Sequence, residues 1–499
     1  MRKKKLLYNT ATSLLNQITM VVCAFILPRL ILTFFGSSVN GLVSSINQFL
    51  TVISFLELGV GAVVQSSLYK PLANKDTDEI SKIIASAGKF FRNLAFVLLG
   101  YVAILLVIYP TLIKRDFGIA YTDTLILSMS ISYFAQYFLG LKNRLLLVAD
   151  QRGYVDYALN TIVLILDNVL CSILIINGFS IQIVKLTASL VLLLRPLLLE
   201  LYVRKHYALN KKIKYTEEPI KQKWNGVAQH IASVVLNSTD TIVLTLFSTL
   251  SNVSIYNVYF LIVNGLKTLV VSISSGMQSL IGNMLATKEY EKLSRVFTAY
   301  ESVYHFAVTF IFGCTAVLIV PFVQVYTNGI TDANYNVPLF GVLISIANMA
   351  YCFRIPYNSI VLAAGHYKQT QNSAWIEMAI NIVISVTCVF SFGLIGVAIG
   401  TLVAMLYRTF YLVWYISKNI INRNAMYFIK HFIVDCMCVV CIMLVNNLVQ
   451  LQSLDYMSWI LLALQKGIMV LGICVIINVI CFRKTAIDVL KLFKKRLKK

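Results

Sequence analysis

The nine residues LANKDTDEI at positions 72–80 return as LATKEYEKL at positions 285–293. Both copies follow the pattern Leu-Ala-x-Lys-acid-x-acid-x-aliphatic, and 213 positions separate position 72 from position 285. A common offset at several places indicates that the chain contains two homologous halves. Other pairs recur at nearly the same separation, namely Asn143 with Asn358, Ala149 with Ala364, Gly178 with Gly393, and Arg195 with Arg408.

The composition is that of an integral membrane protein. Of the 499 residues, 58% are hydrophobic and 13% are charged, and the mean hydropathy is +0.77. A soluble protein of this size would need more polar surface. The formal net charge of +22 therefore indicates basic cytosolic loops rather than a nucleic-acid groove, and nucleic acid is not an expected partner.

Apolar runs of about 20 residues are needed to cross a hydrocarbon core of ~30 Å. The run after Lys5 has no small-residue cleavage site, so we expect a first span there rather than a signal peptide. The sequence predicts about fourteen transmembrane helices, at 7–35, 40–68, 90–113, 119–148, 155–177, 181–203, 225–248, 253–285, 296–326, 335–364, 370–391, 394–417, 428–449 and 459–482.

The basic residues predict the orientation. Most of the 43 Lys and Arg residues fall near the termini and in alternate loops, whereas the remaining loops hold only Lys114 and Arg115. By the positive-inside rule, both termini are expected in the cytosol of a multi-pass protein. The tail places Ile487, Leu490 and Phe493 at helical spacing among lysines, so it is expected on the inner membrane surface, or else as a solvated tail.

The repeat predicts two lobes of six helices with the same orientation, because six is an even number. Parallel repeats place a substrate site between the halves and allow alternating access, so the architecture predicts a transporter. The expected parts are a first lobe at 1–208, a basic cytosolic linker at 209–223, a second lobe at 224–418, two additional helices at 419–482 and a basic amphipathic tail at 483–499.

The ten cysteines are scattered, and nearly all lie in apolar runs. The closest set is Cys436, Cys438 and Cys441, with His431 nearby, and it lacks the second ligand pair of a typical zinc site. We therefore expect these cysteines to pack between helices, and we predict no metal and no cofactor. A Gly-rich phosphate loop is also absent from the sequence, so the protein is not expected to be an ATPase.

Four segments carry a resemblance that covers essentially the whole chain: FFGSSVNG at 34–41, ELGVG at 57–61, LYKPLA at 68–73 and AAGHYKQT at 363–370. With them the sequence resembles the polysaccharide flippases of the multidrug/oligosaccharidyl-lipid/polysaccharide exporter superfamily. The resemblance implies an all-α membrane fold of two six-helix lobes plus two C-terminal helices. It also implies a bacterial cytoplasmic-membrane protein that moves undecaprenyl-pyrophosphate-linked oligosaccharides to the outer leaflet for capsule, exopolysaccharide or O-antigen. Polysaccharide polymerase and glycosyltransferases would be its partners.

One departure from the superfamily pattern bears on the substrate. Drug-exporting members typically carry an acidic coupling residue in the first helix, but this chain has no Asp or Glu before Glu57, and its first span carries Arg29. A positive site suits a pyrophosphate and repels a cationic drug. The family's coupling-ion site therefore cannot be transferred to this chain.

Ionisable residues inside spans cost at least ~2.5 kcal/mol at a helix centre, so they normally face protein or a water-filled cavity. We predict that Arg29 and Lys267 attract the pyrophosphate and that Glu57 pairs with them in the empty state. A buried structural ion pair, or an arginine that extends to the interface, is the alternative. Arg354, close to Pro356, is a further cavity candidate.

Four more residues complete the predicted site. Arg195 and Arg408 are repeat mates that either bind substrate or reach the cytosolic headgroups. Asp167 and Asp240 either bind a coupling cation or hydrogen-bond to their neighbours.

Three further classes of function stay open on the sequence. A membrane glycosyltransferase or polymerase of the same pathway would need carboxylates on a sizeable outer loop, and the predicted outer loops are short. The second class is a cation-coupled multidrug exporter of the same fold, and the third is a non-transporting scaffold. The retained charges within the spans argue against the scaffold.

Overall fold

The computed structural model of the chain describes residues 2–113, 117–210, 213, 215, 218–220, 227–421 and 423–482. Every regular element among these residues is a helix, so the predicted all-α class is confirmed. The predicted tail at 483–499 and most of the predicted linker at 209–223 lie outside the described residues.

By their contacts, the residues form two compact units, Met1–Ser254 (unit 1) and Ile255–Lys499 (unit 2). Unit 1 contains α1 (Arg2–Val52), α2 (Phe55–Asn74), α3 (Thr77–Leu112), α4 (Ile119–Ala135), η1 (Gln136–Gly140), α5 (Leu141–Ala149), α6 (Gly153–Ile176), α7 (Ile181–Leu192), α8 (Leu194–His206), α9 (Val227–Phe247) and the start of α10. Unit 2 contains most of α10 (Leu250–Ala286), α11 (Tyr290–Tyr326), α12 (Pro338–Phe353), α13 (Ile355–Ala363), α14 (Tyr367–Phe392), α15 (Leu394–Asn419), α16 (Met426–Val445), η2 (Asn446–Leu448) and α17 (Tyr456–Cys481).

Twelve helical segments of the described residues are long and apolar enough to cross a membrane. The predicted second span is broken at Ile53 and Ser54, where α1 ends and α2 begins. The predicted seventh span corresponds to α9, of which Ser238–Phe247 qualifies as a shorter apolar helix. The other twelve predicted spans each correspond to one of the twelve segments.

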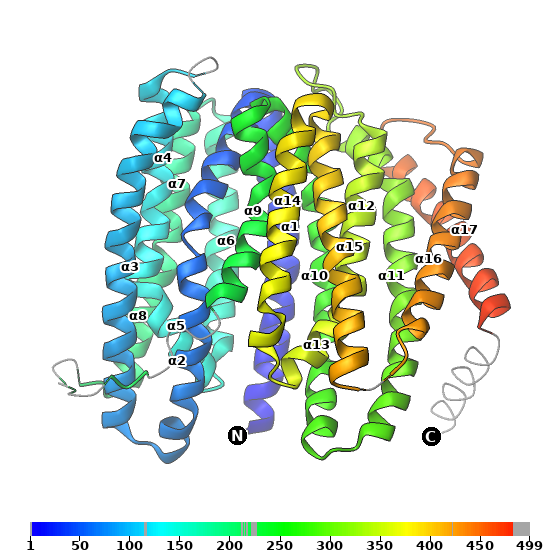
Figure 1. Cartoon of the computed structure of the whole chain (residues 1–499). Coiled ribbons are helices and arrows are strands. Elements are labelled where there is room, and N and C mark those ends of the chain that lie inside the picture. Colours follow the sequence, from blue (N-terminus) through cyan, green and yellow to red (C-terminus); the bar gives the residue numbers. More distant parts are fainter. Residues whose placement is uncertain are drawn as a thin grey trace. The chain divides into compact units, whose positions relative to one another are not determined.

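In unit 1, α1 packs against α6 and α9, and α4 packs against α3 and α7 (Figure 1). Gly36 has a φ of 84°, a conformation that glycine adopts without steric cost, and the chain turns there. Within α1 only this residue has a non-helical backbone, where the sequence predicted a loop between the spans 7–35 and 40–68. The second half of α1 then runs along α9, with Ser45 Oγ 2.7 Å from Thr245 Oγ1. By its contacts α9 belongs to unit 1. The predicted lobe boundaries at 208 and 224 remain a prediction.

The repeated segments form equivalent turns. Lys75 and Lys288 end α2 and α10 with φ values of 56° and 58°. The backbone N–H of Asp76 donates to Pro71 at 3.0 Å, and that of Glu289 donates to Met284 at 3.0 Å. Two more pairs share a positive φ at nearly the same offset, namely Gln151 with Gly365 and Gly178 with Gly393. The sequence repeat is therefore also a repeat of backbone conformation.

In unit 2, α14 and α15 form a closely packed pair, shown in yellow and light orange in Figure 1. The approach is close because α15 presents Gly396 and Gly400 to α14. A Cβ atom at Gly400 would lie 2.2 Å from Ser385 Oγ and 2.8 Å from the Ser385 backbone nitrogen. Small residues at one helical spacing allow backbones in membranes to approach in this way.

We expect Gly400→Val to lower the thermal stability of the purified protein, because α14 must move to admit the side chain. Overpacking of this kind costs about 1–3 kcal/mol. Gly467→Ala on α17 is the matched control, since nothing lies within 4 Å of its Cβ position. Equal unfolding temperatures for Gly400→Val and the control would show that the α14–α15 contact is not tight.

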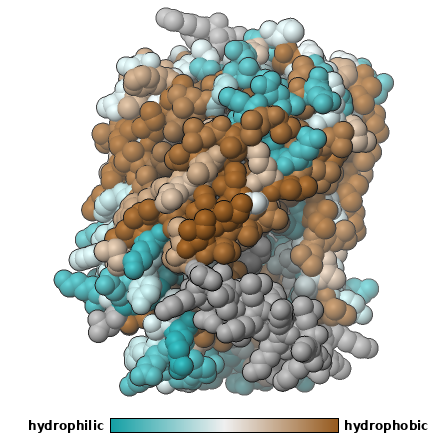
Figure 2. Space-filling view, turned by 90° about the vertical axis from the view of Figure 1, so that its right-hand side faces the viewer, coloured by the Kyte–Doolittle hydropathy of each residue, from teal (hydrophilic) through white to brown (hydrophobic). Residues whose placement is uncertain are grey.

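The outer surface of α16 and α17 is apolar. Leu444 is 76% exposed and Ile468 is 73% exposed. Figure 2 shows a broad hydrophobic band on this side of the protein, with hydrophilic groups above and below it. An exposed apolar band of this extent is the surface that lipid covers in a multi-pass membrane protein.

Candidate functional site

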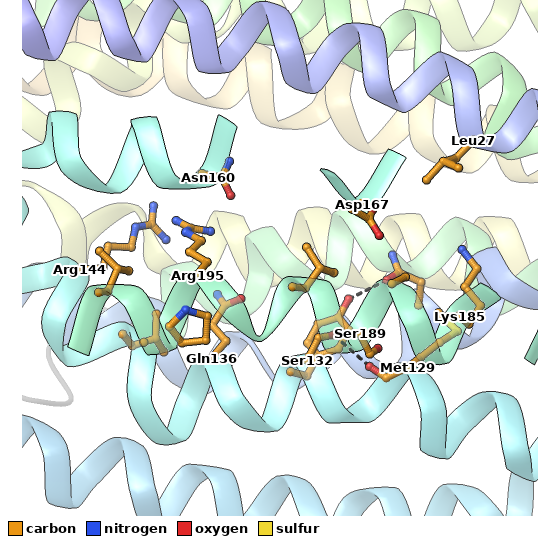
Figure 3. Close-up of a pocket in the computed structure, with 18 residues that line it drawn as sticks. Leu27, Met129, Ser132, Gln136, Arg144, Asn160, Asp167, Lys185, Ser189 and Arg195 are labelled. Carbon is orange, nitrogen blue, oxygen red and sulfur yellow. Dashed lines mark hydrogen bonds between the residues drawn. The ribbon is translucent and has the colours of Figure 1, made fainter. Parts of the chain in front are cut away.

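Unit 1 contains a cavity of about 320 Å³ that is lined by residues of α1, α4, η1, α5, α6, α7 and α8 (Figure 3). Polar and charged side chains alternate with apolar ones around it. The lining residues include Asn47, Ser132, Gln136, Arg144, Asn160, Asp167, Lys185, Ser189 and Arg195. Two of the predicted site residues, Arg195 and Asp167, are among them.

At one end of this cavity two arginines share one acid. Arg195 on α8 donates to Asp156 on α6 from Nε at 3.0 Å and from Nη2 at 2.8 Å. Arg144 on α5 lies 3.5 Å from the same carboxylate, whose side chain is only 2% exposed. The single π-helical turn η1 precedes α5, and such turns are frequent at functional sites. We name this cluster the Asp156 triad.

At the other end, Asp167 on α6 and Lys185 on α7 lie toward one another in Figure 3. Their charges interact, and Asp167 Oδ1 also accepts from Cys171 Sγ at 3.3 Å. The cavity therefore has an arginine-rich end and a carboxylate–ammonium end.

Unit 2 contains a second cluster of the same composition. Arg354 stands between α12 and α13 and forms an ion pair with Glu377 on α14. Arg408 on α15 lies 3.8 Å from the same carboxylate and donates to the Thr370 carbonyl at 2.9 Å. The side chains of Arg354, Glu377 and Arg408 are 13%, 7% and 5% exposed. We name this cluster the Glu377 triad.

Lys267 on α10 extends the Glu377 triad. Its Nζ lies 5.0 Å from the ring centre of Tyr351, and the guanidinium of Arg354 lies 4.1 Å from the same ring. A second aromatic ring, that of Phe260, lies 5.4 Å from Nζ. An aromatic ring attracts cations through its negative face, so Tyr351 stabilises two neighbouring positive charges. Three predicted site residues, Lys267, Arg354 and Arg408, are thus brought together.

The two triads come from equivalent helices of the repeat. In each, the acid lies on the fifth span of its half, one arginine on the fourth and the other on the sixth. Arg195 and Arg408 are the repeat mates found in the sequence. Both arginines bind a carboxylate inside their own unit.

The other predicted residues lie elsewhere. Arg29 on α1 is half-buried and does not line the unit 1 cavity. Glu57 lies in the first turn of α2, and its charge interacts with that of Arg144. Asp240 is buried on α9 and is not among the cavity residues. The roles assigned to these residues remain predictions.

Sequence reasoning missed Asp156, Arg144, Glu377 and Lys185 as members of these clusters. Lys185 and Glu377 lie only four and seven residues from the starts of the predicted spans 181–203 and 370–391, so the sequence did not mark them as deeply buried charges. Glu377 lies ten residues after Tyr367, where α14 begins, which is about 15 Å along the helix. The sequence repeat could have led to both acids. Arg195 and Arg408 occupy equivalent positions, and each buried arginine needs an acidic partner in its own half.

Searches of the chain against protein-family models and against curated proteins found no match. Solved structures do match, at low identity. The lipid II flippase MurJ in its inward closed conformation gives a TM-score of 0.69 at 15% identity, over 96% of this chain and 99% of that one. The Vibrio cholerae MATE transporter VcmN in the bent form gives 0.54 at 15% identity, over 85% and 99% of the two chains. The eukaryotic MATE transporter AtDTX14 gives 0.57 at 12% identity, over 85% and 97%.

These structures define the class of the fold. The chain has the multi-helix fold of the flippase MurJ and of the two MATE transporters, and the predicted all-α fold is confirmed. Within that class, MurJ gives a higher TM-score than the two MATE transporters.

Proposed function

We propose that this protein is a flippase that moves undecaprenyl-pyrophosphate-linked oligosaccharides from the inner to the outer leaflet by alternating access. The Glu377 triad carries the proposal. Two buried arginines share one carboxylate there, and Lys267 adds an ammonium beside them. The triad alone has an excess of one positive charge, which a phosphate group neutralises through charge-assisted hydrogen bonds.

The arginines suit a pyrophosphate better than they suit a neutral or cationic ligand. A guanidinium offers a planar fork of donors that matches phosphate oxygens, and it keeps its charge in an apolar environment. A cationic drug at the same place would meet like charges. Arg29 is proposed as a further phosphate contact. Glu57 is proposed to pair with the positively charged residues while no substrate is bound.

The unit 1 cavity suits a different task. Its volume of about 320 Å³ lies at the small end of the ligand-pocket range of ~300–1,000 Å³, so a complete lipid-linked oligosaccharide does not fit in it. Its buried carboxylate, Asp167, is proposed as a coupling-cation site, and Asp240 on α9 is a second candidate for that role. The substrate is therefore assigned to the Glu377 triad and Lys267.

We further propose that the protein resides in a bacterial cytoplasmic membrane with both termini in the cytosol. The distribution of Lys and Arg residues supports this orientation. Glycosyltransferases would supply the lipid-linked repeat on the cytosolic side, and a polysaccharide polymerase would consume it outside.

The experiment that tests the proposal is deletion of the protein in its own host. Synthesis of single repeats on the lipid carrier should continue, while long polymer disappears. The repeats should accumulate facing the cytosol, where a sugar-modifying enzyme added outside spheroplasts cannot reach them.

Two other outcomes would contradict the flippase. Repeats that accumulate on the outer face would indicate a polymerase, because transport would then be intact. Unchanged polymer with altered tolerance of toxic compounds would indicate a multidrug exporter.

A further inference from the structure

Unit 2 contains a buried polar network between α11 and α16. Glu301, His305 and Thr309 follow one another at four-residue intervals on α11, so they share one face of that helix. Asp435 and His431 face them from α16. Glu301 is 0% exposed, His305 1% and Asp435 2%.

The centre of the network is the contact between His305 and Asp435. The Nδ1 atom of His305 lies 2.6 Å from Asp435 Oδ2. The hydroxyl of Thr309 donates to Asp435 Oδ1 at 2.7 Å. The imidazole is stacked on Phe353, with ring centres 4.5 Å apart, and Phe428 lies edge-on at 5.4 Å. These rings keep the pair in an apolar environment.

The guanidinium of Arg423, the cation in this network, already has an ionic partner. Arg423 forms an ion pair with Glu301, which also accepts a hydrogen bond from the Tyr357 hydroxyl. Asp435 therefore depends on His305 for charge compensation. If the imidazole were neutral, the pair would carry one buried negative charge, and a buried charge without an ionic partner is strongly unfavourable.

We propose that His305 and Asp435 form a proton-binding site that stabilises the contact between α11 and α16. One proton added to the neutral imidazole and the ionised carboxylate makes the pair neutral as a whole, whichever of the two residues holds it. The Nε2 atom of His305 is buried and has no hydrogen-bond partner among the described residues, so no further group fixes the tautomer. None of the described residues forms a group of three or more His, Cys, Asp or Glu side chains that could hold a metal ion.

Other titratable groups surround the pair but do not replace it. The imidazole of His431 lies 5.3 Å from that of His305, and its Nε2 is 3.2 Å from the Ser302 hydroxyl rather than from a carboxylate. The groups that face the pair from α11, α13, α16 and the loop before α16 are Glu301, Tyr357, His431, Cys436, Cys438 and Arg423.

The site lies where the additional helices meet the second half of the repeat. Apolar packing of Val434, Cys438 and Ile442 against Val317 continues the contact beyond Asp435, and α17 joins it through Val470. Loss of the proton would leave a buried charge in this interface. We therefore expect the attachment of α16 and α17 to weaken as the pH rises.

The test measures the thermal unfolding of the full-length protein in lipid nanodiscs between pH 5 and pH 9, without substrate, so it does not depend on the proposed flippase activity. The wild-type unfolding temperature should fall by several degrees as the pair loses its proton. This dependence should be absent from Asp435→Asn, which removes the buried carboxylate. It should be retained in His206→Gln, whose imidazole is exposed in the last turn of α8.

The proposal is overturned if Asp435→Asn shows the wild-type pH dependence. If Asp435→Asn does not give folded protein, Thr309→Val decides the question. It removes one donor to the carboxylate and keeps both members of the pair. The fall in unfolding temperature with rising pH should therefore persist in this variant. An unfolding temperature of Thr309→Val that does not change with pH would reject the proton site.

Discussion

Replacing Lys267 with alanine should abolish surface polysaccharide in a strain that lacks the chromosomal copy, with the protein still present in the membrane. A contact to a charged group contributes about 1.5–3 kcal/mol, which corresponds to about a 10- to 150-fold loss of affinity. Lys267→Arg should retain part of the function, since it keeps the positive charge beside Tyr351. The measurement is polymer on the cell surface, compared at equal protein levels.

The matched control for this substitution is Lys292→Ala. Lys292 also lies in unit 2, but its side chain is 61% exposed and pairs with Glu289 in the turn before α11. Polymer should be unchanged in this variant. Full polymer output from Lys267→Ala would remove Lys267 from the substrate site.

Glu377→Ala should be the most destabilising of the charge substitutions. It leaves the guanidinium groups of Arg354 and Arg408 without their shared carboxylate, and both are largely buried. Breaking a buried ion pair by removing one partner costs about 3–5 kcal/mol. We expect a markedly lower unfolding temperature for the purified protein.

The repeat supplies an internal control for this prediction. Asp156→Ala removes the corresponding acid of unit 1, but the side chains of Arg144 and Arg195 are 46% and 23% exposed and can be hydrated. Water can therefore solvate the two guanidinium groups once their acid is removed, so the loss of stability should be smaller than for Glu377→Ala. An equal or larger loss for Asp156→Ala would contradict the ranking of the two triads.

The architecture could be predicted because it depends on signals that a sequence carries directly. Hydrophobic run length gives membrane helices, and a fixed offset gives the repeat, which the backbone confirms at Lys75 and Lys288. Breaks within spans could not be predicted in this way. The change from α1 to α2 at Ile53 and Ser54 and the change from α7 to α8 at Leu193 occur inside apolar runs. The mean hydropathy of an apolar run does not reveal a break in the helix within it.

The site could be predicted only in part. Charge inside an apolar run drew attention to Lys267, Arg354, Arg195 and Arg408, and the structure assigns a partner or neighbour to each. The acids were missed because distance from a span end was a poor guide to burial. For Glu377, the span was predicted to begin at 370, whereas α14 begins at Tyr367. The predicted distance of Glu377 from the helix start was therefore three residues too short.

The network of His305 and Asp435 was beyond sequence reasoning for a different reason. The four-residue spacing of Glu301, His305 and Thr309 defines a polar face on α11, but it does not identify the helix that covers this face. The partner, Asp435, is 130 residues away in the chain. It lies in the additional helices, for which the repeat provides no equivalent.

The unequal exposure of the two triads has a consequence for how the halves respond to ionic strength. Dissolved ions screen charges that water reaches, with a Debye length of about 8 Å at physiological salt, and they act far less on buried pairs. The contact of Asp156 with Arg144, whose side chain is 46% exposed, should therefore weaken as salt is added, whereas the contacts of Glu377 with Arg354 and Arg408 should not. Two groups of the same net charge, at equivalent places of the sequence repeat, should thus differ in how strongly the electrolyte affects them.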